Sequence, residues 1–207
     1  CNDQGALISL DLSYLNITGY LPDKLAALKG LEVLDVRYNH LTGWTPYVPG
    51  LSNLTSLKLS HNNFTGPIPD YVGDLSSLNS LWLSSNSLSF AVPSSLSLLS
   101  ALVDLRLGKN SLSSSLPTQL GLLSRLTRLD VDAQSVYTYD GLTLYLGGII
   151  PGSLGYLESL QILNMSTNGF TGGIPDSFGG LTALRYLNLE NQGRLSGTLP
   201  LSLFQIK

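Results

Sequence analysis

Leucines recur along the chain in one short pattern of apolar and polar positions. Counted from the first leucine of a unit, positions 1, 4, 6 and 11 are apolar, as Leu78, Leu81, Leu83 and Leu88 show. The alternation around positions 4 to 6 has the period of a β-strand, whose successive side chains point to opposite faces. We therefore expect one short strand with a buried face in each unit.

The residues between these leucines indicate that the other face of the strands meets water. Buried parallel strands are usually apolar on both faces. Here position 5 carries polar or charged side chains and one tryptophan. The residues at this position are Asp11, Asp35, Lys58, Trp82, Arg106, Asp130, Asn164 and Asn188.

The second half of each unit has glycine and proline at fixed places, as in residues 66–69 and 172–175. Glycine permits a tight bend and proline ends a hydrogen-bonded ladder, and a short helical segment such as residues 70–75 is expected to lead into the next unit. Successive units begin 24 residues apart at Leu54, Leu78 and Leu102, a period that is typical of leucine-rich repeats. The eight units are closed by Pro22, Pro46, Pro69, Pro93, Pro117, Pro151, Pro175 and Pro200.

This periodicity predicts an α/β solenoid: a right-handed superhelix of leucine-rich repeats with a parallel sheet on the concave face. Residues 1–207 are expected to form a single domain of eight repeats whose terminal caps are both incomplete. Cys1 is the only cysteine. It is either half of a bridge to an upstream residue or a free thiol at a frayed end.

Asparagine recurs at position 9, and its amide is expected to satisfy backbone groups in the turn after each strand. Leu15 and Gln134 replace this asparagine, while Phe90 and Ser114 replace the glycine of the second half, so these units are expected to be locally looser. The asparagines are Asn39, Asn62, Asn86, Asn110 and Asn168.

The sixth repeat is longer than the others, with surplus residues near 137–147. Insertions in a solenoid loop out on one face, which is often the binding face. The other interpretation is a variable surface loop that has no function.

Composition excludes several classes of function. Charged residues make up 12% of the chain and the net charge is -3, which argues against a nucleic-acid partner. No apolar stretch is long enough for membrane insertion of this chain. His40 and His61 lack suitably spaced partners, so no metal site, cofactor or catalytic nucleophile is expected. Asp130 and Asp132 could hold a cation or act as an acid and base pair, but neighbouring carboxylates on a solvated sheet are usually just solvated. We expect no enzyme activity.

The phrase Phe64-Thr65-Gly66-Pro67-Ile68-Pro69 resembles the plant-type extracellular leucine-rich repeat, and the resemblance covers nearly the whole chain. The opening residues 1–13 are similar to the junction between the N-terminal cap and the first repeat of plant receptor kinases and receptor-like proteins. In that family the cap cysteine pairs with one a few residues upstream. Some relatives carry an island insertion that helps to form the ligand pocket, and the shorter insertion around Tyr139 is similar to it.

This resemblance implies an extracellular or cell-surface ectodomain, reached through the secretory pathway, that binds a peptide, a small molecule or a partner protein on its concave face. A co-receptor is a possible further partner. Polygalacturonase inhibitors share the repeat phrase, so a secreted inhibitor of cell-wall hydrolases is one alternative. A structural component of an extracellular assembly is another.

Outward positions of successive strands should form columns on the concave face, so that residues far apart in sequence become neighbours. An exposed tryptophan flanked by cations is typical of a recognition hot spot, although a single exposed aromatic residue is ordinary on any surface. The candidate ligand-binding residues are Arg37, Tyr38, Lys58, His61, Trp82, Arg106, Lys109, Arg128, Asp130 and Tyr139.

Four N-x-S/T triplets are candidate glycosylation sites, which fits passage through a secretory pathway. A sugar on Asn164 would stand in the central column of the sheet and confine docking to the second to sixth repeats. The triplets begin at Asn16, Asn53, Asn63 and Asn164.

Overall fold

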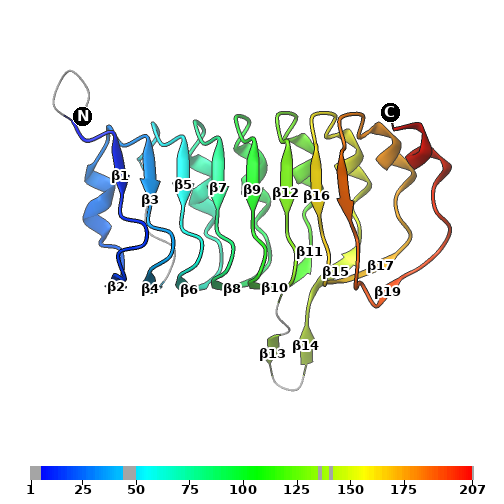
Figure 1. The fold of residues 1–207 in the computed structure, drawn as a ribbon, viewed down its shortest axis with the longest axis horizontal. Helices are drawn as coiled ribbons and strands as arrows, with labels where there is room; N and C mark the ends of the chain where they lie inside the picture. The colour runs from blue at the N-terminus through cyan, green and yellow to red at the C-terminus, as the bar shows by residue number, and fades with distance from the viewer. Residues whose placement is uncertain (1–5, 44–49, 135–136, 140–141, 207) are drawn as a thin grey trace.

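The computed structural model describes residues 6–43, 50–134, 137–139 and 142–206. The chain winds through successive coils that stack side by side, with a row of parallel strands on one side and short helices behind them (Figure 1). The predicted leucine-rich repeat solenoid with a parallel sheet on its concave face is therefore confirmed.

The main sheet has eight strands in sequence order, one from each coil. Every pairing is parallel and in register, so that Lys58 lies opposite Trp82, and Trp82 opposite Arg106. Equal positions of neighbouring repeats thus form the columns expected from the sequence. The strands are β1 (Ser9–Asp11), β3 (Val33–Asp35), β5 (Ser56–Lys58), β7 (Ser80–Trp82), β9 (Asp104–Arg106), β12 (Arg128–Asp130), β16 (Ile162–Asn164) and β18 (Tyr186–Asn188).

A second row of strands follows the first along one edge of the stack (Figure 1). These strands are also parallel, in the orders β10-β8-β6-β4-β2 and β11-β15-β17-β19. They are β2 (Thr18–Gly19), β4 (His40–Gly43), β6 (Asn63–Gly66), β8 (Ser87–Phe90), β10 (Ser111–Leu112), β11 (Ser114–Ser115), β15 (Leu146–Ile149), β17 (Gly169–Gly172) and β19 (Arg194–Leu195).

The surplus residues of the sixth repeat form an antiparallel hairpin, β13 (Tyr137–Tyr139) with β14 (Leu142–Leu144), of which the description covers the backbone. The hairpin projects away from the stacked coils (Figure 1). The regular stack resumes at once, because β15 pairs in parallel with β11 of the preceding coil.

Seven 3-10 helices in the described ranges lie behind the sheet, each beginning directly after a proline. Proline suits this place because its φ is fixed near the helical value and its missing N–H would be unpaired there anyway. None of the described helices has the length and apolar character needed to cross a membrane. The helices are η1 (Asp23–Ala27), η2 (Asp70–Asp74), η3 (Ser94–Leu98), η4 (Thr118–Leu122), η5 (Gly152–Tyr156), η6 (Asp176–Gly180) and η7 (Leu201–Gln205).

The leucines of the repeat pattern form one continuous core along the stack. Leu78, Leu81, Leu83 and Leu88 are all buried, as the spacing of the repeat pattern predicted. Because each coil packs only on its neighbours, this core has no single centre and grows by one layer with each repeat.

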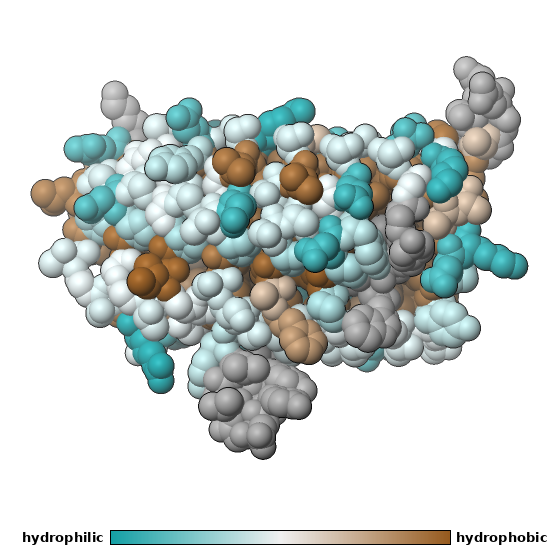
Figure 2. All heavy atoms as spheres, turned by 180° about the vertical axis from the view of Figure 1, so that it is seen from behind, coloured by the Kyte–Doolittle hydropathy of each residue, from teal (hydrophilic) through white to brown (hydrophobic). Residues whose placement is uncertain are grey.

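Glycines on the helical side allow the coils to approach closely. A Cβ at Gly155 would collide with the backbone carbonyl of Ser177 in the next coil, and Gly121 stands in the same relation to Ser153. The helical face is mostly pale in Figure 2, with separate apolar side chains on it. Leu98, Leu122 and Tyr156 are exposed and occupy the same position in three neighbouring helices.

The side-chain amides at position 9 hold the turns together, as the sequence suggested. Asn62 accepts a hydrogen bond from the Leu41 N–H (3.0 Å) and donates to the carbonyls of Val36 and Leu59 (2.9 and 3.1 Å). The expected loosening at Gln134 is wrong. Its side chain accepts from the Leu112 N–H and donates to three carbonyls, because the longer glutamine reaches the same backbone groups.

Position 8 adopts the left-handed conformation in all eight repeats, with φ between 47° and 58°. This region is unfavourable for residues other than glycine, asparagine and aspartate. Phe90 and Ser114 likewise keep the positive φ (66° and 68°) of the glycines that they replace, so the backbone path is the same and the cost is local strain. The position 8 residues are Tyr14, Tyr38, His61, Ser85, Lys109, Ala133, Thr167 and Asn191.

Candidate functional site

A hollow of about 240 Å³ lies on the concave face of the second to sixth repeats. We call it the Trp82 hollow. Seven of the ten predicted ligand-binding residues line it, which shows that the columns bring them together. The lining residues are Arg37, Tyr38, Ser60, His61, Trp82, Ser84, Ser85, Arg106, Lys109, Asp130 and Asp132.

Trp82 points to the concave face as expected, but it is half-buried and not exposed. Three cations cover its ring: the Cζ atoms of Arg106 and Arg37 lie 3.9 and 5.0 Å from the ring centroid, and the Nζ of Lys58 lies 4.7 Å from it. The indole Nε1 is buried and has no hydrogen-bond partner among the described residues. Trp82 therefore acts first as a platform that holds the cations on the concave face.

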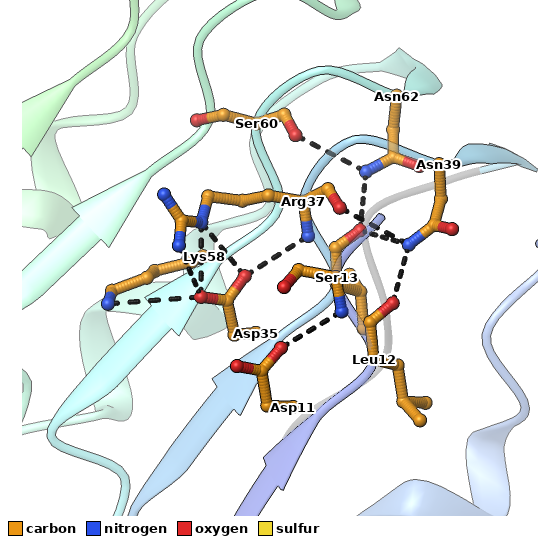
Figure 3. Close-up of polar contacts among 10 residues, drawn as sticks. Asp11, Leu12, Ser13, Asp35, Arg37, Asn39, Lys58, Ser60 and Asn62 are labelled. Atoms are coloured by element: carbon orange, nitrogen blue, oxygen red, sulfur yellow. Dashed lines mark hydrogen bonds and ion pairs between the residues drawn. The ribbon is translucent and has the colours of Figure 1, made fainter. Parts of the chain in front are cut away.

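The cation on one side of Trp82 is fixed by a carboxylate of its own repeat. The Arg37 guanidinium donates through Nε and Nη2 to both oxygens of Asp35, at 2.7 to 3.1 Å (Figure 3). The Lys58 ammonium lies 3.9 Å from the same carboxylate. Hydrogen bonding to Asp35 raises the pKa of Arg37 above its ordinary value. The charge of Asp35 is thus largely compensated within the protein.

An equivalent pair lies on the other side of Trp82. Arg106 donates to both oxygens of Asp104 at 2.7 to 3.1 Å, and Arg128 lies 3.9 Å from that carboxylate. Lys58 and Arg128 do not line the hollow. They lie beside it and help to neutralise the carboxylates of Asp35 and Asp104.

Asp130 and Asp132 form an acid pair at one end of the hollow. Asp130 Oδ1 accepts a hydrogen bond from the Asp132 N–H at 3.3 Å. Gly108 leaves the room this pair needs, because a Cβ there would collide with the Asp132 carboxylate. Burial, followed by repulsion from Asp132, raises the pKa of Asp130 to about 6. The pair thus tends to hold one proton at mildly acidic pH.

This raised pKa predicts a pH effect on stability. The folded protein binds the Asp130 proton more tightly than the unfolded chain, whose pKa is near 3.8. The free energy of unfolding should therefore fall as pH rises from about 4 to about 6. With allowance for solvent screening at this partly exposed pair, we expect a loss of about 1 kcal/mol from Asp130.

Urea unfolding at pH 4.0 and 6.5 measures this effect as a difference between wild type and Asp130→Asn. Asparagine is a matched replacement, because Asn164 and Asn188 stand at the same position and accept the same backbone hydrogen bond in the last two repeats. The variant should lack the loss seen in the wild type. Equal pH dependence in both proteins would contradict the assignment to Asp130, which Asp132, Arg128, Arg106 and Lys109 surround.

Three rings at position 8 stack along the rim of the sheet. The Tyr14 and Tyr38 ring centroids are 4.3 Å apart, and Tyr38 and His61 are 4.1 Å apart, with interplanar angles of 12° and 9°. Burial, assisted by the charges of Lys109 and Arg37, lowers the pKa of His61 below its ordinary value. The last ring of this row is therefore a neutral imidazole at neutral pH.

Sequence reasoning missed the serines that make the hollow deep. Ser60 and Ser84 stand at position 7 of the third and fourth repeats, and Ser85 stands at position 8 of the fourth. The small Ser85 between His61 and Lys109 in the position 8 column was the available signal. Tyr139 belongs to β13, where only the backbone is described, so this candidate lies outside the described side chains.

The four candidate glycosylation sites differ in their surroundings. Asn16 and Asn63 are exposed. Asn53 is exposed too, but its Nδ2 donates to the Lys29 carbonyl at 3.0 Å. Asn164 is half-buried in the central column, and its Oδ1 accepts from the hydroxyl of Ser166 at 3.0 Å.

The hollow combines several kinds of polar and aromatic group. It offers stacked aromatic rings, cations and an acid pair within one surface. Among the residues with described side chains, no three histidine, cysteine, aspartate or glutamate residues lie close enough together to hold a metal ion.

Known proteins share both the repeats and the fold. Residues 53–75 and 159–181 match the leucine-rich repeat family. The leucine-rich repeat receptor protein kinase MSL1 of Oryza sativa subsp. japonica is 44% identical over 68 residues, which are 32% of this chain and 5% of that protein. The Arabidopsis receptor kinase HAESA, solved with the peptide hormone IDA and the co-receptor SERK1, has a TM-score of 0.82 at 31% identity, over 98% of this chain and 37% of that chain.

The chain spans only 4% to 10% of the length of the curated relatives it matches. A chain of the BIR3–SERK2 complex from Arabidopsis thaliana is matched over a larger share of its own length. The match covers 69% of this chain and 75% of that one, at 33% identity and a TM-score of 0.60. Since the family matches lie in two separate repeats and the chain covers 75% of a relative at 33% identity, it belongs to the leucine-rich repeat proteins, and it is similar to those of plant receptor kinases.

Proposed function

We propose that this chain is an extracellular or cell-surface recognition module that binds a segment of a peptide or partner protein in the Trp82 hollow. The single observation that carries the proposal is the preorganised set of cations over Trp82, placed on the concave face and flanked by stacked rings. Aromatic residues and arginine dominate binding energy in protein interfaces, and ion pairs already formed in the free protein reduce the cost of ordering.

The charges around the hollow favour specific binding of a ligand over a general attraction to one sign of charge. Asp35 and Asp104 compensate the arginines, while Lys109, Asp130 and Asp132 make no ion pair with the described residues. Both signs of charge are therefore available to a ligand within one small surface, which gives orientation and specificity.

Relatives of this chain support the kind of partner. HAESA was solved with a peptide hormone and a co-receptor, and another similar structure is PEPR1 with AtPEP1. The corresponding partners of this chain are a peptide and, as a further partner, a co-receptor. Asn16 and Asn63 are exposed and could accept a glycan, which accords with the proposed passage through the secretory pathway.

Selection from a displayed library of random peptides tests this proposal. Selected peptides should bind the wild-type chain and lose at least a hundredfold in affinity for the Trp82→Ala/Arg106→Ala variant, because both the platform and its nearest cation are removed. The matched control is Tyr186→Ala/Asn188→Ala, which alters the same face in the last repeat, outside the hollow, and should change affinity less than twofold.

Circular dichroism and urea unfolding show whether each variant is folded. A library that yields no binder, or binders whose affinity for a folded Trp82→Ala/Arg106→Ala variant is unchanged, would contradict binding in the Trp82 hollow.

A further inference from the structure

The row of stacked rings at position 8 stops inside the Trp82 hollow. Tyr14, Tyr38 and His61 follow one another in the first three repeats, but the next residue of the row is Ser85, and Lys109 comes after it. The backbone row itself continues without a break. The N–H of Ser85 donates to the Gly108 carbonyl at 2.9 Å, as that of His61 does to Ser84 at 3.0 Å.

We propose that the space above Ser85 receives an aromatic side chain of the peptide ligand, which stacks on His61 as the fourth ring of the row. This inference rests on the proposed function and specifies the group that the Trp82 hollow recognises. His61, Ser85 and Lys109 all line that hollow.

The spacing of the sheet fits one inserted ring. Neighbouring strands lie roughly 4.8 Å apart, so the two strand spacings between His61 and Lys109 leave about 9.6 Å, enough for one ring with contacts on both faces. The existing rings stack at 4.1 and 4.3 Å, which is close to the same repeat. The inserted ring would meet a neutral imidazole on one face and the Lys109 ammonium on the other, and both contacts are favourable.

The size of the hollow favours a side chain over a whole small molecule. Its volume of about 240 Å³ is below the roughly 300 Å³ at which sites for small molecules begin. The hollow lies along the columns of the main sheet, so the backbone of an extended peptide can continue over neighbouring repeats while one side chain enters.

A substitution at Ser85 can fill this space with a side chain of the protein itself. Ser85 has φ 55°, the same value as Tyr38, and Tyr14 has φ 58°. Tyrosine is thus accommodated at this position in two other repeats, and Ser85→Tyr should fold and place its own ring on His61. Thr167→Tyr is the matched control, because Thr167 has φ 56°, is exposed and lies outside the hollow.

Titrations followed by NMR of the probe test the proposal. The probes are capped Gly-Tyr-Gly, capped Gly-Leu-Gly and p-cresol, the free form of the tyrosine ring. The tyrosine peptide should bind at least fivefold more tightly than either other probe. Its affinity should fall at least tenfold in Ser85→Tyr and stay within twofold in Thr167→Tyr.

Equal affinity of the tyrosine and leucine peptides, or binding that survives in folded Ser85→Tyr, would overturn the proposal. Binding of p-cresol as tight as that of the tyrosine peptide would overturn its peptide part and indicate a free aromatic ligand. Library peptides that depend on Trp82 and Arg106 but not on the space above Ser85 would leave the proposed function standing and reject the inserted ring.

Discussion

Replacing Asn110 by alanine is expected to lower the free energy of unfolding by about 3 kcal/mol. Asn110 is 1% exposed. Its Oδ1 accepts from the Leu88 N–H at 3.0 Å, and its Nδ2 donates to the carbonyls of Leu83 and Leu107 at 3.0 and 2.8 Å. Alanine leaves the buried Leu88 N–H without this partner, at a cost of about 1–3 kcal/mol. It also removes one of the two amide donors from each carbonyl, although Asn86 still donates to Leu83 and Gln134 to Leu107, both at 3.0 Å.

The site of this change makes the effect larger than that of a single lost contact. Asn110 of the fifth repeat bonds to backbone groups of the fourth, so alanine weakens an interface in the middle of the stack. The stability of a solenoid depends on the interfaces between neighbouring repeats. We therefore expect a broader urea transition as well as an earlier one, measured by circular dichroism.

Two further variants serve as controls for Asn110→Ala. Asn79→Ala, at an exposed position, should change stability by less than about 0.5 kcal/mol. Asn110→Gln should retain much of the lost stability, because Gln134 and Gln192 make equivalent bonds at the same position. A loss below about 1 kcal/mol in Asn110→Ala would show that water or backbone shifts replace the amide.

The second large effect is expected from Gly155→Ala, which should destabilise the protein by about 3 kcal/mol. The added Cβ would run into the backbone carbonyl of Ser177 in the next coil. A backbone group cannot turn aside as a flexible side chain can, so the two coils must separate. That separation also disturbs the Ser177 hydroxyl, which donates to the Gly152 carbonyl at 2.6 Å.

The same helix offers a matched control for this prediction. A Cβ at Gly152 would lie 3.4 Å from the Ser177 hydroxyl and 4.0 Å from Pro175. Gly152→Ala should therefore be neutral or stabilise the protein by up to about 1 kcal/mol, since alanine restricts the unfolded chain. Urea unfolding of the two variants side by side is the measurement, and equal stability would reject close packing of the helical face as the reason for the glycine.

The close packing of the coils on the helical face could not be predicted from the sequence alone. The recurring glycine of the helices and the serine of the following coil are both visible in the chain, yet their contact depends on the distance between coils. In contrast, the position of the asparagine amides was predictable, because a polar group repeated beside buried leucines must bond to the backbone. The tolerance of glutamine at position 134 was not predictable, since it depends on how far the side chain reaches.

The period and the alternation of leucines determined the solenoid, its sheet and the columns of its concave face. They could do so because in a stack of equal coils the neighbour of a residue is the same position one repeat away. For that reason the repeat pattern by itself places Arg37, Trp82 and Arg106 on one surface, although they are far apart along the chain.

Only the tertiary structure decided what each side chain on that surface covers. Register brings Trp82 beside three cations, but the choice among rotamers closes them over its ring and pairs the arginines with Asp35 and Asp104. The space above Ser85 exists for the same reason: the rings before it stack on one another, and a serine cannot continue the row. The repeat period determines which residues are neighbours. Which of those neighbours each side chain contacts depends on the three-dimensional competition among charges, rings and solvent.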